Sequence, residues 1–152
     1  MDVTSVLPLT ADEELLWRSL TRVAIALPRA LDDDLARHAG MSMTEYGVLM
    51  NLSEAPGGQL RMSELAAATS LSASRITRLV GDLQKLGLVA RDRCAGDARG
   101  YVTTLTGAGL SRLKAAYPGH LASVRNRVMD HIDPAAVAAL AQALHRIAAD
   151  LP

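Results

Sequence analysis

The sequence predicts a fold dominated by α-helices, with one small β-hairpin in the second half of the chain. Apolar residues make up 49% of the 152 residues, yet only 3% are aromatic and Phe is absent. Alanine and leucine, both strong helix formers, therefore carry most of the apolar content. Strand-like composition is confined to residues 88–105, between long segments of helical periodicity. These observations disfavour a β-sandwich or a barrel.

The bulk properties indicate a single domain spanning residues 1–152, because this length supports one core that folds unaided. Cys94 is the sole cysteine, which excludes an intramolecular disulfide and fits a reducing compartment. The N-terminus has no basic region followed by an apolar stretch, and no apolar run approaches the roughly 20 residues that span a bilayer. We therefore expect a cytoplasmic protein with no membrane partner.

The first half of the chain predicts two helices. One is expected over residues 11–39, where apolar residues recur at spacings of three and four. Pro28 lies inside this pattern and should kink the helix or remove one hydrogen bond. The second is expected from about Met43 to the Ala-Pro-Gly-Gly sequence at residues 55–58, which is typical of a loop.

Two short helices follow, at residues 63–69 and 73–86, with a Ser-Leu-Ser turn between them. Ser72 in this turn is well placed to cap the second of these helices. Residues 88–93 and 101–105 are strand-like and flank a loop that contains glycine, which predicts a β-hairpin.

The remainder of the chain is expected to be helical again. Thr106 should cap a helix over residues 107–131, which Pro118 bends or breaks. The pair Asp133-Pro134 predicts the start of a last helix, because a capping aspartate and a proline in the first helical position favour helix initiation.

Helix, turn, helix and hairpin, in this order, form the pattern of a winged helix-turn-helix, expected within residues 43–106. In such a module the second helix enters the major groove of double-stranded DNA. The formal net charge is zero overall, but residues 61–100 carry +3 whereas residues 1–60 carry −5. Positive charge is therefore concentrated in the segment expected to meet phosphate.

A helical projection of residues 73–86 separates two faces of the predicted recognition helix. The face expected to pack on the domain carries Ile76, Leu79, Val80, Leu83 and Leu86. The opposite face and its flanks carry Ser74, Arg75, Thr77, Arg78, Gly81 and Lys85. Arginine can bond guanine and hydroxyls can reach bases or phosphates, so the first two turns are expected to contact bases or phosphates, and Lys85 further along is expected to meet phosphate. The alternative is a polar face that is simply solvated.

Arginines also cluster around the predicted hairpin. Arg91 and Arg93 lie on its first strand and Arg99 in its loop, where an arginine suits the negative potential of a narrow minor groove. Asp97 would be repelled by phosphate, so we expect it to hold Arg99 or the loop backbone. The full set predicted to lie at the DNA interface is Arg61, Ser63, Ser72, Ser74, Arg75, Thr77, Arg78, Lys85, Arg91, Arg93, Asp97 and Arg99.

The segment Leu60–Gly109 resembles the winged helix-turn-helix of the multiple antibiotic resistance regulator (MarR) family. The resemblance rests on S-E-L-A, S-x-S-x-I-T-R-L-V, L-x-K-x-G-L-V, and D-x-R followed by V-x-x-L-T-x-x-G. It implies a DNA-binding transcriptional regulator, most simply a repressor released by a small-molecule effector. Two positions depart from the family's pattern: Gly81 stands where Asp is often found, and Leu86 where a basic residue is common.

The resemblance also implies that the first and last helices of two subunits pack together. Apolar stripes at both ends of the chain support this, namely Leu15, Leu16, Leu20, Val23 and Leu27, and Val137, Leu140, Leu144, Ile147 and Leu151. The alternative is that each stripe folds against its own subunit. We favour a homodimer with residues 11–40 and 107–152 as dimerisation helices, because a two-fold dimer suits a palindromic operator.

An effector of such regulators commonly binds between the dimer helices and the winged domain. Trp17, Tyr46 and Met50 are candidates to line that cavity, although methionine and aromatic residues at helical spacing are also typical of a plain core.

The sequence lacks three kinds of motif that are typical of enzymes. It has no glycine-rich phosphate loop, nucleophile elbow or clustered acid–base set, so we expect neither an enzyme nor a cofactor.

Two further alternatives stay open. One is a winged helix used only for protein–protein contact; the other is a metal- or redox-sensing regulator of the same family. Cys94 lies near Arg91 and Arg93, which favour a thiolate. The histidines are His38, His120, His131 and His145. None of their spacings is that of a zinc motif, so no metal site is expected.

Overall fold

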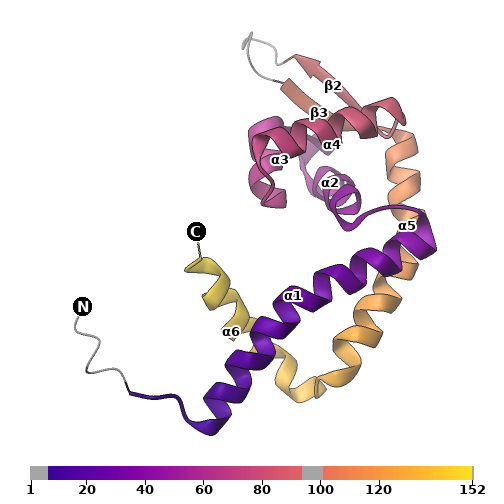
Figure 1. The fold of residues 1–152 in the computed structure, drawn as a ribbon. Helices are drawn as coiled ribbons and strands as arrows, with labels where there is room; N and C mark the ends of the chain where they lie inside the picture. Colours follow the sequence, from indigo (N-terminus) through magenta and orange to yellow (C-terminus); the bar gives the residue numbers. More distant parts are fainter. Residues whose placement is uncertain (1–6, 94–100, 152) are drawn as a thin grey trace.

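The computed structural model describes residues 7–93 and 101–151 and shows a compact head joined to a longer helical arm (Figure 1). The arm consists of α1 (Ala11–Ala39), α5 (Gly107–Arg127) and α6 (Val137–Ala149). The head holds α2 (Met43–Glu54), α3 (Met62–Thr69), α4 (Ala73–Lys85), β1 (Gln59–Arg61), β2 (Val89–Arg93) and β3 (Tyr101–Leu105). Short 3₁₀ turns lie at Pro56–Gly58, Met129–His131 and Pro134–Ala136. The predicted fold class, mostly helical with a small hairpin wing, is confirmed.

Capping side chains fix where the first two helices begin. The Thr10 hydroxyl accepts a hydrogen bond from the Glu13 backbone N–H at 3.3 Å, and the Glu13 carboxylate accepts one from the Thr10 backbone N–H at 2.8 Å. Ser42 and Glu45 repeat this reciprocal arrangement at α2. Gly40 ends α1 in the left-handed conformation, with φ of 56°, which glycine adopts without strain.

Both long helices of the arm continue through a proline. α1 runs past Pro28, and α5 runs past Pro118 as far as Arg127. Of the bend or break predicted at Pro118, the break is therefore wrong, and the bend stays a prediction. A proline removes one helical hydrogen bond, and the extensive packing of α5 along α1 offsets that loss. At Gly119 the two helices lie close together, since a Cβ atom there would sit 3.3 Å from the Cβ atom of His38.

The described residues form a sheet with strand order β1-β3-β2, antiparallel throughout. β2 and β3 are the predicted hairpin, in register from Val89 opposite Leu105 to Arg93 opposite Tyr101. β1 was not predicted, because three residues are too few to show a strand period. It forms only through its pairing with β3, far along the chain.

The core of the head forms where α2, α3, α4 and β2 meet, and Ile76, Val80 and Leu83 of α4 are buried in it as predicted. The prediction for Leu86 is wrong, because its side chain is 65% exposed. α4 ends at Lys85 and the backbone turns at Gly87, where φ is 71°. A helical projection therefore no longer applies at Leu86.

One hydroxyl joins the wing to the arm. Thr106 Oγ1 accepts a hydrogen bond from the Gly109 backbone N–H at 3.0 Å and so caps α5. The same oxygen lies 2.7 Å from the Gly87 carbonyl and 3.0 Å from the Leu88 carbonyl, immediately before β2. No helix in the described part of the chain is long and apolar enough to span a bilayer.

Candidate nucleic-acid interface

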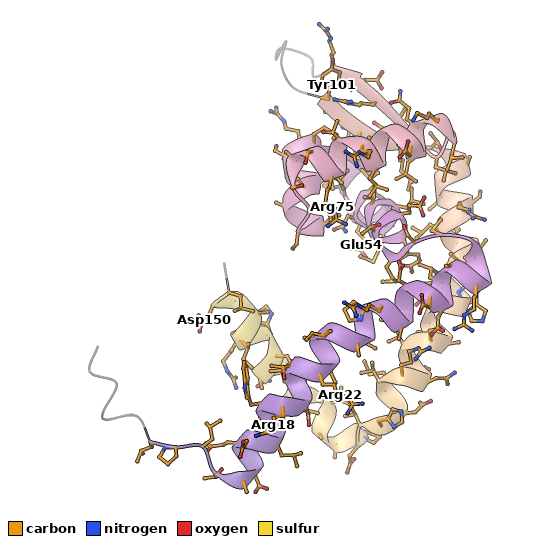
Figure 2. All side chains as sticks on the ribbon, in the orientation of Figure 1. Arg18, Arg22, Glu54, Arg75, Tyr101 and Asp150 are labelled. Carbon is orange, nitrogen blue, oxygen red and sulfur yellow. The ribbon has the colours of Figure 1, made fainter. Side chains whose placement is uncertain are left out.

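The outward face of α4 carries the side chains predicted to meet base edges. Ser74, Arg75, Thr77 and Arg78 are all exposed, whereas Ile76 between them is buried. Figure 2 labels Arg75 on the head, whereas Arg18 and Arg22 lie on the arm. Within residues 7–93 and 101–151, no ion pair engages Arg75 or Arg78. Both guanidinium groups are therefore available to an external anion or to guanine.

The hydroxyls on this helix differ in what they can still do. Ser72 accepts a hydrogen bond from the Arg75 backbone N–H at 3.4 Å, which confirms it as the helix cap. Thr77 Oγ1 donates its only hydrogen to the Ala73 carbonyl at 2.7 Å. While that bond persists Thr77 can only accept, so it fits an exocyclic amine of adenine or cytosine rather than a phosphate. Ser74 Oγ lies 3.2 Å from Ser72 Oγ.

Lys85, at the end of α4, is paired within its own helix. Its Nζ atom lies 2.8 Å from Asp82 Oδ1, and both side chains are exposed. Exposed ion pairs of this kind are weak, so the pair competes little with a phosphate. Gly81, one of the departures from the family pattern, leaves α4 continuous, and a Cβ atom there would meet nothing within 4 Å.

Arg61 and Ser63 lie at the start of α3, beside the wing. Arg61 ends β1 opposite Val102 of β3, and its backbone N–H donates to Glu64 at 2.8 Å. Ser63 occupies the first turn of α3, and both side chains are exposed. The structure thus places these two predicted contacts between α3 and the sheet.

The wing contributes two arginines from β2. Arg93 is exposed at the end of the strand, while Arg91 is partly buried with its Cζ atom 4.0 Å from the ring centroid of Tyr101. Figure 2 shows Tyr101 at the far end of the sheet. Cys94, Asp97 and Arg99 lie outside the described residues, so their predicted roles stay predictions.

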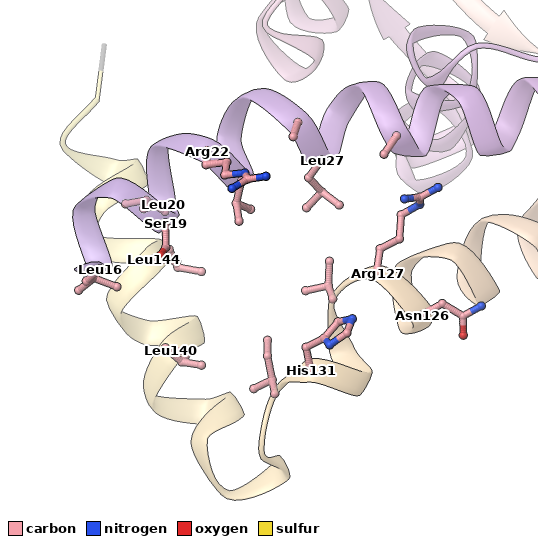
Figure 3. Close-up of a pocket in the computed structure, with 15 residues that line it drawn as sticks. Leu16, Ser19, Leu20, Arg22, Leu27, Asn126, Arg127, His131, Leu140 and Leu144 are labelled. Atoms are coloured by element: carbon pink, nitrogen blue, oxygen red, sulfur yellow. The ribbon is translucent and has the colours of Figure 1, made fainter. Parts of the chain in front are cut away.

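The arm presents an apolar surface of its own. Exposed on α1 and α6 are Leu15, Leu16, Trp17, Val23, Ile25, Val137, Leu140, Leu144 and Ile147. None of the α6 residues, all of which are described, is buried in the single chain. A groove of about 700 Å³ runs between α1, the end of α5 and α6. Figure 3 shows Leu20 and Leu27 on one side of it and Leu140 and His131 on the other.

A buried carboxylate, paired with two partly or largely exposed arginines, holds α1 against α5. Asp34 of α1 is buried, and its carboxylate accepts hydrogen bonds from Arg127 of α5 and from Arg37. The hydrogen bonds from Arg127 lower the pKa of Asp34 to about 2, with smaller contributions from Ser123 and the charge of Arg37. The sequence alone does not predict this network, because the run Asp32-Asp33-Asp34 does not indicate which of its carboxylates faces inward.

The candidate effector residues do not gather around one cavity in the single chain. Trp17 is 58% exposed on α1 and lines a separate shallow depression with Pro8 and Leu9. Tyr46 is buried in the core and Met50 packs against that core. Their assignment to an effector pocket stays a prediction.

The histidines form no cluster of three or more among the described residues. His120 lies at the contact of α5 with α2, its ring centroid 4.6 Å from that of Tyr46, and burial lowers its pKa. No group of three or more possible metal ligands comes together among the described residues.

Comparison with known proteins identifies the class to which this head and arm belong. A sequence profile of the MarR family matches residues 39–100. Over 85 residues, 56% of the chain and 51% of the relative, the sequence is 32% identical to the HTH-type transcriptional repressor YetL of Bacillus subtilis (strain 168). The chain spans about half the length of the curated relatives it matches.

Solved structures agree over almost the whole chain. A MarR family transcriptional regulator of Streptomyces coelicolor in complex with DNA, Sco3205, has a TM-score of 0.87 and 38% identity, covering 97% of this chain and 92% of its own. AbsC, a MarR family regulator of the same organism, has a TM-score of 0.84 and 36% identity, covering 94% and 96%. The chain belongs to the MarR family of transcriptional regulators, as the sequence resemblance predicts.

Proposed function

We propose that the chain is a homodimeric, sequence-specific DNA-binding repressor that recognises a pseudo-palindromic operator. The observation that carries the proposal is the pair Arg75 and Arg78, exposed and without ion pairs within the described residues, on the first two turns of α4. Arginines in this position can bond guanine in the major groove. The similarity to a regulator in complex with DNA supports DNA binding, and the similarity to a transcriptional repressor supports repression.

The dimer in this proposal uses the arm. An amphipathic helix such as α6 normally buries its apolar side, yet every one of its residues is exposed or partly exposed in the single chain. Apolar patches of this kind mark association surfaces. A two-fold dimer would present two α4 helices to successive major grooves. Catalysis is no part of the proposal, and release by a small-molecule effector rests on the family resemblance alone.

The direct experiment measures binding of the purified protein to DNA from its own upstream region at several salt concentrations. A steep linear fall of log K with log salt is expected, because phosphate contacts release counterions. A winged helix that serves only protein–protein contact predicts no salt-dependent binding. That result would remove the DNA-binding proposal.

Two substitutions refine the assignment of contacts. Arg78→Ala should alter the preference for one base pair by roughly 1–3 kcal/mol, as expected for loss of a bidentate contact. A uniform loss across all sequences would instead make Arg78 a phosphate contact. Arg99→Ala should weaken binding severely and leave the dimer intact. Arg125→Ala, an exposed arginine on α5 far from α4 in sequence, serves as the matched control.

A further inference from the structure

The pairing of β2 with β3 places the side chains of Arg91 and Tyr101 diagonally across from each other and in contact. Arg91 lies opposite Thr103, and Arg93 lies opposite Tyr101. Directly opposed residues of an antiparallel pair project on the same face of the sheet, so all four side chains share one face. Thr103 is fully buried, which shows that this face is turned toward the rest of the head.

Arg91 is held on this face by Tyr101. The Arg91 Cζ atom lies 4.0 Å from the ring centroid, well inside the roughly 6 Å over which a cation and an aromatic face attract each other. The Nε atom of Arg91 is buried and makes no hydrogen bond with the described residues. Among residues 7–93 and 101–151, the guanidinium group is thus located by the ring, and no carboxylate of these residues forms an ion pair with it.

Arg93, two residues further along β2, provides a contrast. It is exposed, whereas Arg91 is partly buried. An arginine side chain loses rotational freedom when it binds a phosphate, and prior ordering reduces that loss. Contact with a ring covers one face of a guanidinium group, and the terminal amino groups of Arg91, unlike its buried Nε–H, can still donate hydrogen bonds.

We propose that Tyr101 is a positioning residue for DNA binding, which orders Arg91 at the base of the wing for contact with the phosphate backbone. This inference rests on the proposed DNA-binding function. The competing explanation is that Tyr101 only stabilises the hairpin. In that case its loss changes the melting temperature and leaves the arginine's contribution to DNA affinity untouched.

The test is a double-mutant cycle on operator affinity with Tyr101→Ile, Arg91→Ala and the double variant. Isoleucine keeps strand propensity while removing the ring. Tyr101→Ile should raise the Kd about three- to tenfold and reduce the steepness of the salt dependence. Tyr101→Phe should stay within about twofold of the native Kd, because the ring face and not the hydroxyl makes the contact. In the Arg91→Ala background Tyr101→Ile should have no further effect.

Each outcome of the cycle supports or overturns the positioning role of Tyr101. Equal losses from Tyr101→Ile with and without Arg91 overturn the proposal, as does a Tyr101→Phe variant as weak as Tyr101→Ile. If the native protein binds operator but Tyr101→Ile binds equally well, the positioning role falls and the proposed function stands. If the native protein binds no DNA at any salt concentration, both fall.

A second measurement needs no altered protein. Nitrogen-15 relaxation of the arginine Nε–H groups in the free native protein should show Arg91 ordered to nearly the level of the backbone. Arg93 is the internal control and should be mobile. Equal mobility of the two side chains would contradict ordering by Tyr101, even if Tyr101→Ile fails to fold.

Discussion

Arg127 of α5 donates two hydrogen bonds to the carboxylate of Asp34 in α1, although the two residues are 93 positions apart. Arg127 Nε lies 2.5 Å from Asp34 Oδ2, and Arg127 Nη2 lies 2.8 Å from Asp34 Oδ1. Arg37 donates to the same carboxylate from the following turn of α1. One buried carboxylate therefore joins the two long helices of the arm.

The stability of the fold should depend on the ionisation of Asp34. Its pKa is about 2 in the folded chain, against an ordinary value of 3.8. The stabilisation is therefore fully present above pH 3.8 and is lost as the pH falls through about 2. Asp34→Asn should lower the melting temperature at pH 7 and flatten its dependence on pH between 4 and 2. Asp33→Asn, an exposed neighbour, is the control, and an identical acid response in both variants would contradict the assignment.

Gly109 should be intolerant of any side chain. A Cβ atom there would lie 2.1 Å from the Leu88 carbonyl oxygen and 2.7 Å from Leu105 Cδ1. Because one neighbour is backbone that cannot move aside cheaply, Gly109→Ala should cost roughly 3 kcal/mol or more in the free energy of unfolding. Gly107→Ala, where a Cβ atom meets nothing within 4 Å, should leave the free energy of unfolding nearly unchanged. Urea denaturation of both variants measures the difference, and similar midpoints would refute the close approach.

Replacing Gly81 should stabilise the protein. Gly81 lies inside α4 with helical geometry and open space at its Cβ position. Gly81→Ala should therefore raise the free energy of unfolding by about 0.5–1 kcal/mol. Gly87→Ala is the opposing control, because φ of 71° at Gly87 disfavours a side chain and the change should destabilise. A loss of stability in Gly81→Ala would mean that α4 needs a flexible point there.

The dimer proposed above should depend on the exposed stripe of α6. Leu144→Glu places a charge on that stripe and should raise the dimer dissociation constant by at least about thirtyfold, as for a typical interface hot spot. Sedimentation equilibrium gives this constant directly. Leu86→Glu, which alters another exposed leucine just after the end of α4, should leave the dissociation constant unchanged. A dimer that withstands Leu144→Glu would place the interface elsewhere.

Local sequence signals account for most of the head. The spacing of Ile76, Val80 and Leu83 predicts which side of α4 is buried, because helical geometry fixes which residues share a face. Ser72 is readable as a cap for the same reason, since capping depends only on its own turn of helix. The exposed arginines of α4 follow from these two features.

The prediction for Leu86 fails for a local reason, the end of α4 at Lys85, but the other failures depend on residues distant in sequence. β1 exists only as a partner of β3, and Asp34 is distinguished from Asp33 only by the approach of Arg127. α5 remains unbroken at Pro118 where it packs along α1. The contact between Arg91 and Tyr101 likewise requires the register of β2 against β3, which pairs residues eight to sixteen positions apart.

The hydroxyl of Thr106 bears on how movement could pass through the molecule. It caps α5 and at the same time donates to the backbone just before β2. The start of α5 is therefore joined directly to the start of the wing, without a flexible linker. A tilt of α5 would therefore be transmitted directly to the base of the wing. In the dimer proposed above, an event at the far end of the arm would then alter the spacing and angle of the two heads without unfolding either of them.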